Sequence, residues 1–287
     1  MWTPSTPVAR VVVVLAVLLL GGCAAGGGAR DRASDPGTPE FVTFRSGDLL
    51  LKGLIWRPAG PGPHPAVVFN HGSERYHDVH FALLGPAFAR EGYVFFAPYR
   101  RGQGLSADQG AWVLDTLGRV AQEQGMLARG RKVVELLKTE QIGDLLAAIA
   151  HLTARPDVDK SRIAIVGNSF GGILTMMMAE RGDPGVKAAI NMAGAALNWS
   201  RSPDIKEWMF EMARAARVPV LFMQAENDED TGPSRELAGE MTRLGKTNRM
   251  RIFPPFGKTA ADGHSFGYLG GEFWVPEAVR FLRENMR

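Results

Sequence analysis

Short apolar runs alternate with longer amphipathic segments along the chain from residue 41 to its end. The short runs are rich in β-branched and aromatic residues, which indicates buried strands, whereas the longer segments repeat apolar residues three and four positions apart, which indicates helices. Strands that alternate with helices at this spacing pair in parallel through right-handed crossovers. The pattern therefore predicts a doubly wound, mostly parallel α/β sheet with an N-terminal antiparallel hairpin formed by residues 41–44 and 49–56.

Two segments interrupt this alternation. Residues 107–130 mix polar and apolar positions without a strong period, so we expect a small insertion over the carboxyl ends of the strands. Residues 198–217 replace what would otherwise be a short connection between two strands. The remaining elements follow the pattern, with strands expected at residues 66–70, 93–97, 163–166, 186–192, 218–224 and 249–253, and helices at residues 81–91, 133–152, 173–180, 234–244 and 277–286.

The first residues carry the features of an export signal. Residues 11–20 are ten continuous apolar residues, too few for a membrane-spanning helix but typical of the apolar core of a signal peptide. Leu20-Gly21-Gly22-Cys23 then resembles the bacterial lipobox, in which a cysteine is lipidated and becomes the first residue after cleavage. We therefore expect a lipoprotein-type signal peptide at residues 1–22 and a lipidated Cys23. The alternative is an ordinary secretory signal cleaved near Ala24 or Ala25, so that Cys23 is discarded.

The expected processing sets the domain organisation and the location. Residues 23–39 are rich in Gly, Ala, Asp and Pro and are typical of a flexible tether. Residues 40–287 are long enough for one domain with a single sizeable core. A chain anchored through Cys23 would lie in the bacterial cell envelope, on its periplasmic or extracellular face, and an ordinary signal would instead give a secreted soluble protein.

Composition and charge narrow the function classes. The 33 basic and 30 acidic residues give a formal net charge of +3 without a long run of one sign, whereas nucleic-acid binders usually present a basic stripe. Cys23 is the only cysteine, so no disulfide forms within the chain. His71, His77 and His80 suggest a metal site, but they lack acidic partners and the spacing of the usual ligand sets. We therefore expect no nucleic-acid partner, no metal and no cofactor.

The chemistry centres on Gly167-Asn168-Ser169-Phe170-Gly171, a Gly-x-Ser-x-Gly motif between an expected strand and an expected helix. This context is that of a nucleophile elbow, in which a tight turn lifts the serine hydroxyl above the edge of the sheet. Glycine flanks the serine because a side chain there would collide with the neighbouring strand or helix. We therefore predict Ser169 as a nucleophile, and the alternative is a glycine-rich turn with an incidental serine.

Two side chains after the elbow complete the predicted site. A serine hydroxyl is a weak nucleophile and needs a base oriented by a carboxylate. In folds with such an elbow, the acid and then the histidine follow the serine along the chain. His264 is the only histidine after Ser169, so it is the predicted base. The acid is expected in the acidic loop after the next-to-last strand, where Asp228 is preferred and Asp230 and Glu226 are the alternatives.

An oxyanion that forms during attack on a carbonyl is stabilised by preorganised donors. We expect one donor to be the amide of Phe170, directly after the nucleophile, because the elbow points this amide at the incoming oxyanion. The second donor is expected to be the amide of Ser73, in the loop that follows an earlier strand, where Gly72 lets the backbone turn.

The connection at residues 198–217 carries Trp199, Trp208 and Phe210, more apolar bulk than a solvated loop needs. Open α/β sheets bind ligands beyond the carboxyl ends of their strands, where such an excursion lies. We therefore expect these three side chains to line a substrate pocket. The alternative is that Trp208 and the methionines near it form one face of a helix packed on the core.

Several stretches carry a resemblance to a known superfamily: His71-Gly72, residues 101–106, residues 158–163, residues 167–172, and the loops around Asp228 and His264. On these residues, the chain resembles the α/β-hydrolase superfamily over about residues 40–287. Within it, the chain is most similar to dienelactone hydrolase-like proteins and to the catalytic domain of prolyl oligopeptidase-type peptidases. The resemblance implies an α/β-hydrolase fold with a Ser-Asp-His triad and an acyl-enzyme intermediate.

Two departures from the family pattern bear on the activity. The true dienelactone hydrolases carry a cysteine nucleophile where this chain has Ser169, and the family's loop after the fourth strand often has an aspartate where this chain has Tyr99. We therefore expect a serine hydrolase that cleaves a small or medium ester, with a peptidase or amidase acting on short peptides as the alternative. A ligand-binding lipoprotein with a hydrolase-like cleft is the non-enzymatic alternative, and the oligomeric state stays open.

Overall fold

The computed structural model describes residues 37–75 and 78–287. The predicted signal peptide, Cys23 and most of the predicted tether lie outside the described residues, so these assignments stay predictions. Within the described part of the chain, no helix combines the length and the apolar character that crossing a bilayer requires.

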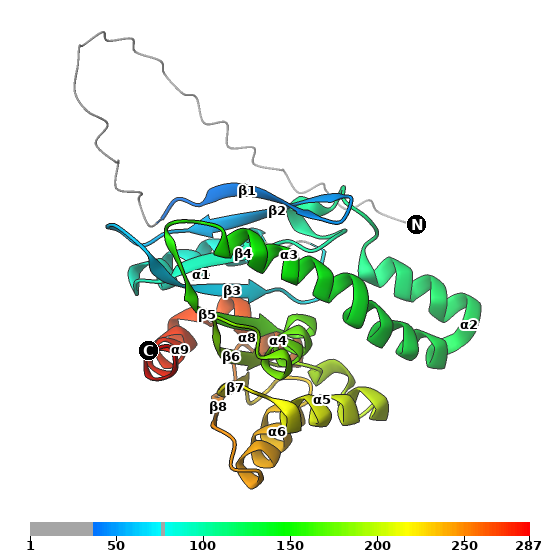
Figure 1. Ribbon diagram of the computed structural model, residues 1–287. Coiled ribbons are helices and arrows are strands. Elements are labelled where there is room, and N and C mark those ends of the chain that lie inside the picture. The colour runs from blue at the N-terminus through cyan, green and yellow to red at the C-terminus, as the bar shows by residue number, and fades with distance from the viewer. Residues whose placement is uncertain (1–36, 76–77) are drawn as a thin grey trace, which may run out of the picture. The chain divides into compact units, whose positions relative to one another are not determined.

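One eight-stranded sheet forms the centre of the domain, in the order β1-β2-β4-β3-β5-β6-β7-β8 (Figure 1). β2 pairs with β1 and with β4 in antiparallel fashion, and the other neighbouring pairs are parallel. The predicted mostly parallel sheet with an N-terminal hairpin is therefore confirmed. The strands are β1 (Glu40–Ser46), β2 (Leu49–Trp56), β3 (His64–Asn70), β4 (Val94–Pro98), β5 (Val158–Asn168), β6 (Val186–Met192), β7 (Val220–Ala225) and β8 (Asn248–Phe253).

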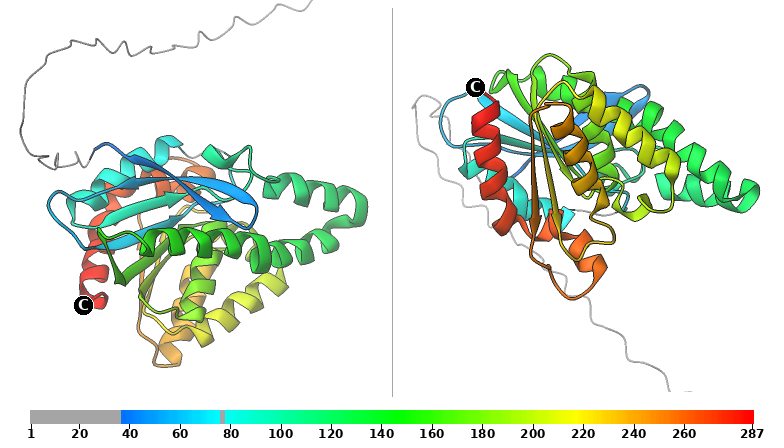
Figure 2. Two further views of the ribbon diagram at one scale, coloured as in Figure 1. Left: turned by 45° about the horizontal axis from the view of Figure 1, so that its top comes forward. Right: turned by 90° about the horizontal axis from the view of Figure 1, so that it is seen from below.

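Helices cover both faces of the sheet (Figure 2). Along β3, Val68 contributes to the core on one face while Val67 and Phe69 contribute to the core on the other, as the alternation of side chains along a strand requires. Burial on both faces explains why the strands appear in the sequence as nearly continuous apolar runs. One face carries α1 (Asp78–Arg90), α8 (Phe266–Leu269) and α9 (Gly271–Asn285), and the other carries α3 (Ile142–Thr153), α4 (Phe170–Arg181), α5 (Pro203–Ala215) and α6 (Gly232–Arg243).

The segment without a clear period is largely helical. α2 (Val113–Leu136) reverses direction at Gly125, whose φ of 85° and ψ of 173° are not helical, and forms a hairpin that extends beyond the carboxyl edge of the sheet (Figure 1). A π-helical turn at Leu137–Gln141 joins α2 to α3, so the helix expected at residues 133–152 belongs to a longer, interrupted one. Because much of the hairpin is solvated, its sequence carries no continuous apolar stripe.

The three aromatic residues expected to line a substrate pocket lie on α5 or shortly before it, and two of them, Trp199 and Trp208, are buried. Trp208 is 9% exposed and Met209 is fully buried, both in the core beneath α5, which packs against α4 and α6. The ring of Trp199 lies 5.8 Å from that of Phe210, and its Nε1 donates to Glu236 Oε1 at 2.8 Å. The burial of Trp208 and Met209 is the arrangement that the alternative, one face of a helix packed on the core, describes.

Candidate active site

The turn between β5 and α4 holds Ser169 at the carboxyl edge of the sheet. Its φ of 56° and ψ of −119° are a strained conformation for a residue other than glycine, as a nucleophile elbow requires. A Cβ on Gly167 would lie 2.3 Å from the carbonyl oxygen of Gly171, and a Cβ on Gly171 would lie 2.0 Å from that of Asn70. The predicted reason for both glycines, collision with the neighbouring helix and strand, is confirmed.

Three side chains from separate loops meet at this edge. Ser169 Oγ lies 2.8 Å from His264 Nε2, and His264 Nδ1 lies 2.8 Å from Asp228 Oδ1. Asp228 follows β7, and His264 ends the short helix α7 (Ala260–His264), which a capping box between Thr259 and Asp262 fixes. The three residues are between 6% and 8% exposed. A base that touches a hydroxyl and is backed by a carboxylate is the arrangement that activates a serine nucleophile.

The carboxylate of Asp228 is aimed by two further donors. Gln224 Nε2 donates to its Oδ2 at 2.9 Å, and the amide of Glu229 donates to its Oδ1 at 2.7 Å. Gln224 is fixed in turn by the hydroxyl of Ser234, which donates to its Oε1 at 2.6 Å. Gln224 was not singled out in the sequence, although its place at the end of β7 is a signal that it can reach the site.

The two alternative acids lie elsewhere. Asp230 turns back on its own loop, where its Oδ1 accepts the amide of Gly232 at 2.8 Å. Glu226 is exposed. Of the three candidates, Asp228 is therefore the one that the structure brings to His264.

The imidazole of His264 sits among carboxylates. Burial lowers the pKa of His264, while the hydrogen bond and charge of Asp228 and the charges of Glu74 and Glu229 raise it, so that the pKa lies above the ordinary value of 6.5. The protonated ring is thus stabilised, which a base needs when it carries a proton during a reaction.

The loop after β3 lies beside the nucleophile, since a Cβ on Gly72 would be 3.4 Å from Ser169 Cβ. The amide of Gly72 itself is engaged, because it donates to the hydroxyl of Tyr268 from α8. Within residues 37–75 and 78–287, no acceptor takes the amides of Ser73 and Phe170, so both are available to an oxyanion. Sequence reasoning missed Tyr268, which lies 196 residues from Gly72 along the chain.

Arg100 contacts both the loop after β3 and Phe170. It is 2% exposed, and its Nη2 donates to the carbonyl oxygens of His71 at 2.8 Å and Gly72 at 2.7 Å. Its Nε donates to Gln141 Oε1 at 2.9 Å, and its guanidinium carbon lies 5.7 Å from the centre of the Phe170 ring. Burial lowers the pKa of Arg100 to about 10, so the side chain stays charged at neutral pH. A buried cation therefore contacts both segments that carry the available amides.

The histidines considered as metal ligands have other contacts. His71 Nε2 accepts the amide of Arg100 at 3.2 Å, and the ring of His80 stacks on Tyr268 with 5.1 Å between centroids. His77 lies outside the described residues. In the part of the chain that the structure covers, no group of three His, Cys, Asp or Glu side chains is placed to hold a metal ion.

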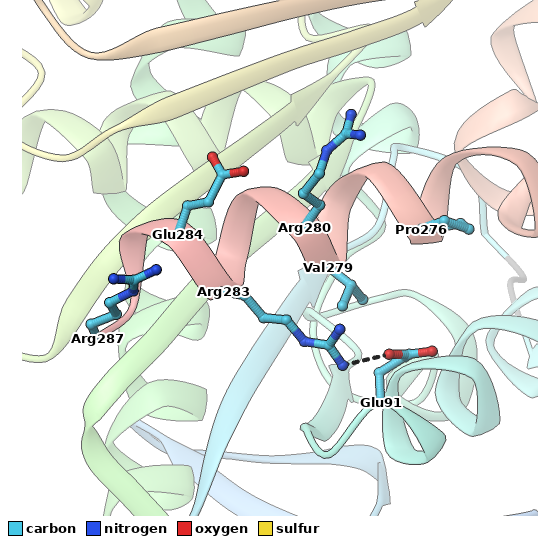
Figure 3. A pocket seen from close by; sticks show the side chains of 7 residues that line it. All are labelled: Glu91, Pro276, Val279, Arg280, Arg283, Glu284 and Arg287. Carbon is cyan, nitrogen blue, oxygen red and sulfur yellow. Dashed lines mark hydrogen bonds and ion pairs between the residues drawn. The ribbon is translucent and has the colours of Figure 1, made fainter.

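A hollow of about 450 Å³ lies in the surface between the end of α1 and the last turns of α9 (Figure 3). Charged side chains of both signs dominate it, and Arg283 Nη2 pairs with Glu91 Oε2 at 2.8 Å. None of the three triad residues lines it, so this hollow is separate from the candidate active site. The lining residues are Glu91, Pro276, Val279, Arg280, Arg283, Glu284 and Arg287.

Comparison with known proteins adds a family and a fold. Residues 51–267 match the model of the dienelactone hydrolase family, a span that includes Ser169, Asp228 and His264. The chain is also 23% identical over 216 residues to the uncharacterized peptidase YtmA of Bacillus subtilis (strain 168), which covers 66% of this chain and 73% of that protein.

Solved structures share the architecture. An acylaminoacyl peptidase from Pyrococcus horikoshii superposes with a TM-score of 0.61 at 20% identity, over 87% of this chain and 42% of that one. A dienelactone hydrolase from Anabaena variabilis superposes with a TM-score of 0.60 at 15% identity, over 87% of this chain and 99% of that one. Both likenesses show the α/β-hydrolase fold, and the chain spans less than half the length of the acylaminoacyl peptidase.

Proposed function

The chain belongs to the dienelactone hydrolase family, and we propose that it is a serine hydrolase that cleaves a small or medium carboxylic ester. The observation that carries the proposal is the continuous hydrogen-bond chain from Ser169 through His264 to Asp228, with 2.8 Å at each step. A binding module has no use for all three groups in this order, whereas an acyl transfer through serine needs each of them.

In the proposed reaction, Ser169 Oγ attacks the ester carbonyl while His264 Nε2 accepts its proton. Asp228 keeps the other ring proton on Nδ1 and stabilises the imidazolium, and the amides of Phe170 and Ser73 stabilise the oxyanion. His264 then protonates the departing alkoxide. The same base next activates a water molecule, which releases the acid from the acyl-enzyme and restores the serine hydroxyl.

A fluorophosphonate probe tests the proposal directly. The purified chain should take up the probe stoichiometrically on Ser169, as peptide mass spectrometry can verify, and should hydrolyse nitrophenyl esters of short or medium acyl chains. Ser169→Ala should do neither. A folded wild-type chain that neither reacts with the probe nor turns over any ester would instead support a ligand-binding lipoprotein.

A second candidate is a peptidase or amidase, which the similarity to a protein named as a peptidase and to an acylaminoacyl peptidase favours. The same triad serves both reactions, so the fold alone does not decide between them. A nitrophenyl ester and a nitroanilide of the same acyl group separate the two. An anilide hydrolysed as efficiently as its matched ester would favour the peptidase.

The pH dependence should report His264. Because the neutral imidazole is the base and its pKa is raised, kcat/KM should be low in acid and should rise with pH through a single ionisation above 6.5. Glu74→Gln and Glu229→Gln should each move this midpoint downward, since each removes a negative charge that favours the imidazolium. A pH profile that is flat through neutrality, or a midpoint that moves upward in both variants, would contradict the assignment.

Replacing Arg100 by methionine should lower kcat by about 10- to 100-fold and leave KM nearly unchanged. The reason is that the carbonyls of His71 and Gly72 lose the cation that fixes them, and a small displacement of a catalytic group has effects of this size. Steady-state kinetics on a soluble ester would measure both constants, and Arg100→Lys should recover part of kcat.

The neighbouring arginine provides the matched control. Arg101 does not contact the loop at residues 71–73 but forms a bidentate pair with the buried Asp144, with bonds of 2.9 and 2.7 Å. Arg101→Met should therefore lower the free energy of unfolding by about 3 kcal/mol, with kcat of the folded enzyme little changed. Equal losses of kcat in both variants would show that Arg100 acts only through stability.

We further propose that Cys23 is lipidated and holds the domain in the cell envelope, with residues 23–39 as the tether. The lipobox-like sequence supports this location. Cys23→Ser should abolish incorporation of a labelled fatty acid. Recovery of unlabelled wild-type chain from the culture medium would favour the secreted alternative.

A further inference from the structure

The hairpin of α2 ends in an apolar corner. Met126 and Leu127 are 68% and 72% exposed, whereas the next most exposed large apolar residue of the described chain, Phe41, is at 56%. They directly follow Gly125, where the helix reverses. Single exposed apolar residues are common on soluble proteins, but an adjacent pair at the corner of a projecting hairpin (Figures 1 and 2) needs a separate explanation.

The arms of the hairpin are firmly rooted, so the corner is not a frayed end. Val113 and Leu117 on the outward arm and Val133 on the return arm are all buried in the core. Met126 lies seven residues before Val133. At 1.5 Å per residue, the corner therefore stands about 10 Å beyond that anchor.

Basic residues lie close to the corner along the sequence. Residues 119–132 contain four basic residues and one acidic residue, a net charge of +3 that equals that of the whole chain, so the other residues sum to zero. Lys132 pairs with Glu135 at 2.6 Å, which leaves the arginines to supply the attraction. Apolar side chains that enter the acyl boundary and cations that meet phosphate headgroups are how peripheral proteins bind anionic bilayers. The arginines are Arg119, Arg129 and Arg131.

The hairpin also begins beside the candidate active site. Trp112, the residue before α2, donates from Nε1 to the carbonyl oxygen of Ser73 at 2.9 Å, and the guanidinium of Arg75 lies 5.5 Å from its ring. α2 follows β4 and Ser169 follows β5, so both leave the same carboxyl edge of the parallel strands. A bilayer that contacts the corner would therefore lie on the side of the sheet that holds the triad.

We propose that Met126 and Leu127 form a docking corner that inserts into an anionic phospholipid bilayer, with Arg119, Arg129 and Arg131 on its headgroups. This contact is distinct from a lipid on Cys23 and does not depend on the proposed hydrolase activity. It orients the domain so that its carboxyl edge faces the bilayer.

The single cysteine permits a test at one position in the full-length chain. In a Cys23→Ser background, Met126→Cys is labelled with an environment-sensitive fluorophore and mixed with vesicles of phosphatidylcholine and phosphatidylglycerol. We expect a blue shift and quenching by nitroxide-labelled lipid. The same fluorophore at Leu244→Cys, a 41% exposed position at the end of α6, should give neither, even if the N-terminus holds the chain on the vesicle.

Charge variants test the contribution of the arginines separately. Arg129→Gln combined with Arg131→Gln should weaken the vesicle affinity by about 25-fold, since each basic residue near an anionic surface contributes about fivefold. Arg280→Gln, on α9, is the control. Hydrolysis of a soluble ester should be unchanged in both variants.

Three results would overturn the proposal. One is the absence of a spectral shift at position 126 with anionic vesicles, and another is an equal shift at positions 126 and 244. The third is a shift that requires an added protein and not lipid, because the corner would then be a protein-binding site.

Discussion

Ser169→Ala should lower kcat for the proposed ester substrate by roughly 10⁴- to 10⁶-fold, the range of triad knockouts elsewhere. The variant removes Oγ, the atom that lies 2.8 Å from His264 Nε2 and would form the bond to the acyl group. Folding should survive, because alanine keeps the Cβ of serine and meets the same strain at a φ of 56°. Steady-state kinetics with active-site titration and a thermal melt would measure the two effects.

A nearby serine supplies the control for this experiment. Ser265 follows His264, and its hydroxyl donates to the carbonyl oxygen of Ala261 at 3.0 Å, away from the triad. Ser265→Ala should change kcat by no more than about twofold, as substitutions away from a buried network usually do. If Ser169→Ala kept about a tenth of the wild-type rate, far above a triad knockout, the nucleophile would have to be another residue.

The elbow and the triad could be located from the sequence for two reasons. The glycines of the elbow depend on local contacts, and the acid and the histidine follow the serine in a fixed order along the chain. Gly167 and Gly171 are required by contacts of their own turn with an adjacent helix and strand. His264 had no competitor after Ser169. The sheet was predictable for a similar reason, since strands buried on both faces appear as apolar runs.

The residues that support the site could not be located in this way, because their partners are far away in the sequence. Tyr268 reaches Gly72 across 196 residues, and Arg100 reaches Gln141 across 41. Neither contact leaves a periodic or motif-like trace. A buried arginine held by carbonyl and amide oxygens, such as Arg100, is also the opposite of what burial statistics favour.

Two segments show what apolar periodicity reveals and what it leaves out. The α2 hairpin is solvated over much of its length, so it lacks the stripe by which a helix is detected. α5 has such a stripe, and Trp208 and Met209 lie on it. The aromatic residues there were expected to line a pocket, whereas helical periodicity predicts packing on the core. Apolar periodicity reports burial against the protein itself and says little about surfaces that meet a substrate or a membrane.

Asp228→Asn should lower kcat by about 10⁴-fold, the size expected when the orienting carboxylate becomes an amide. The hydrogen bonds of the site show why the amide does not fit. Asp228 Oδ1 faces His264 Nδ1 and accepts the amide of Glu229, and Oδ2 accepts Gln224 Nε2. An NH₂ group in place of Oδ1 would face the amide of Glu229, and an NH₂ group in place of Oδ2 would face Gln224 Nε2, so that a donor meets a donor in both cases. If the NH₂ group faces His264, it stabilises the tautomer with the proton on Nε2, which cannot accept a proton from Ser169.

The same loop provides two matched controls for this prediction. Asp230→Asn removes a carboxylate whose Oδ1 accepts the amide of Gly232 in its own turn, and Glu226→Gln removes an exposed charge. Each should change kcat by no more than about threefold, as substitutions outside a hydrogen-bonded network usually do. Equal and small effects of all three variants on kcat, with unchanged pH profiles, would mean that His264 is oriented without Asp228. A large effect of Asp230→Asn alone would assign the role to the other aspartate, and the loop would then have to rearrange when substrate binds.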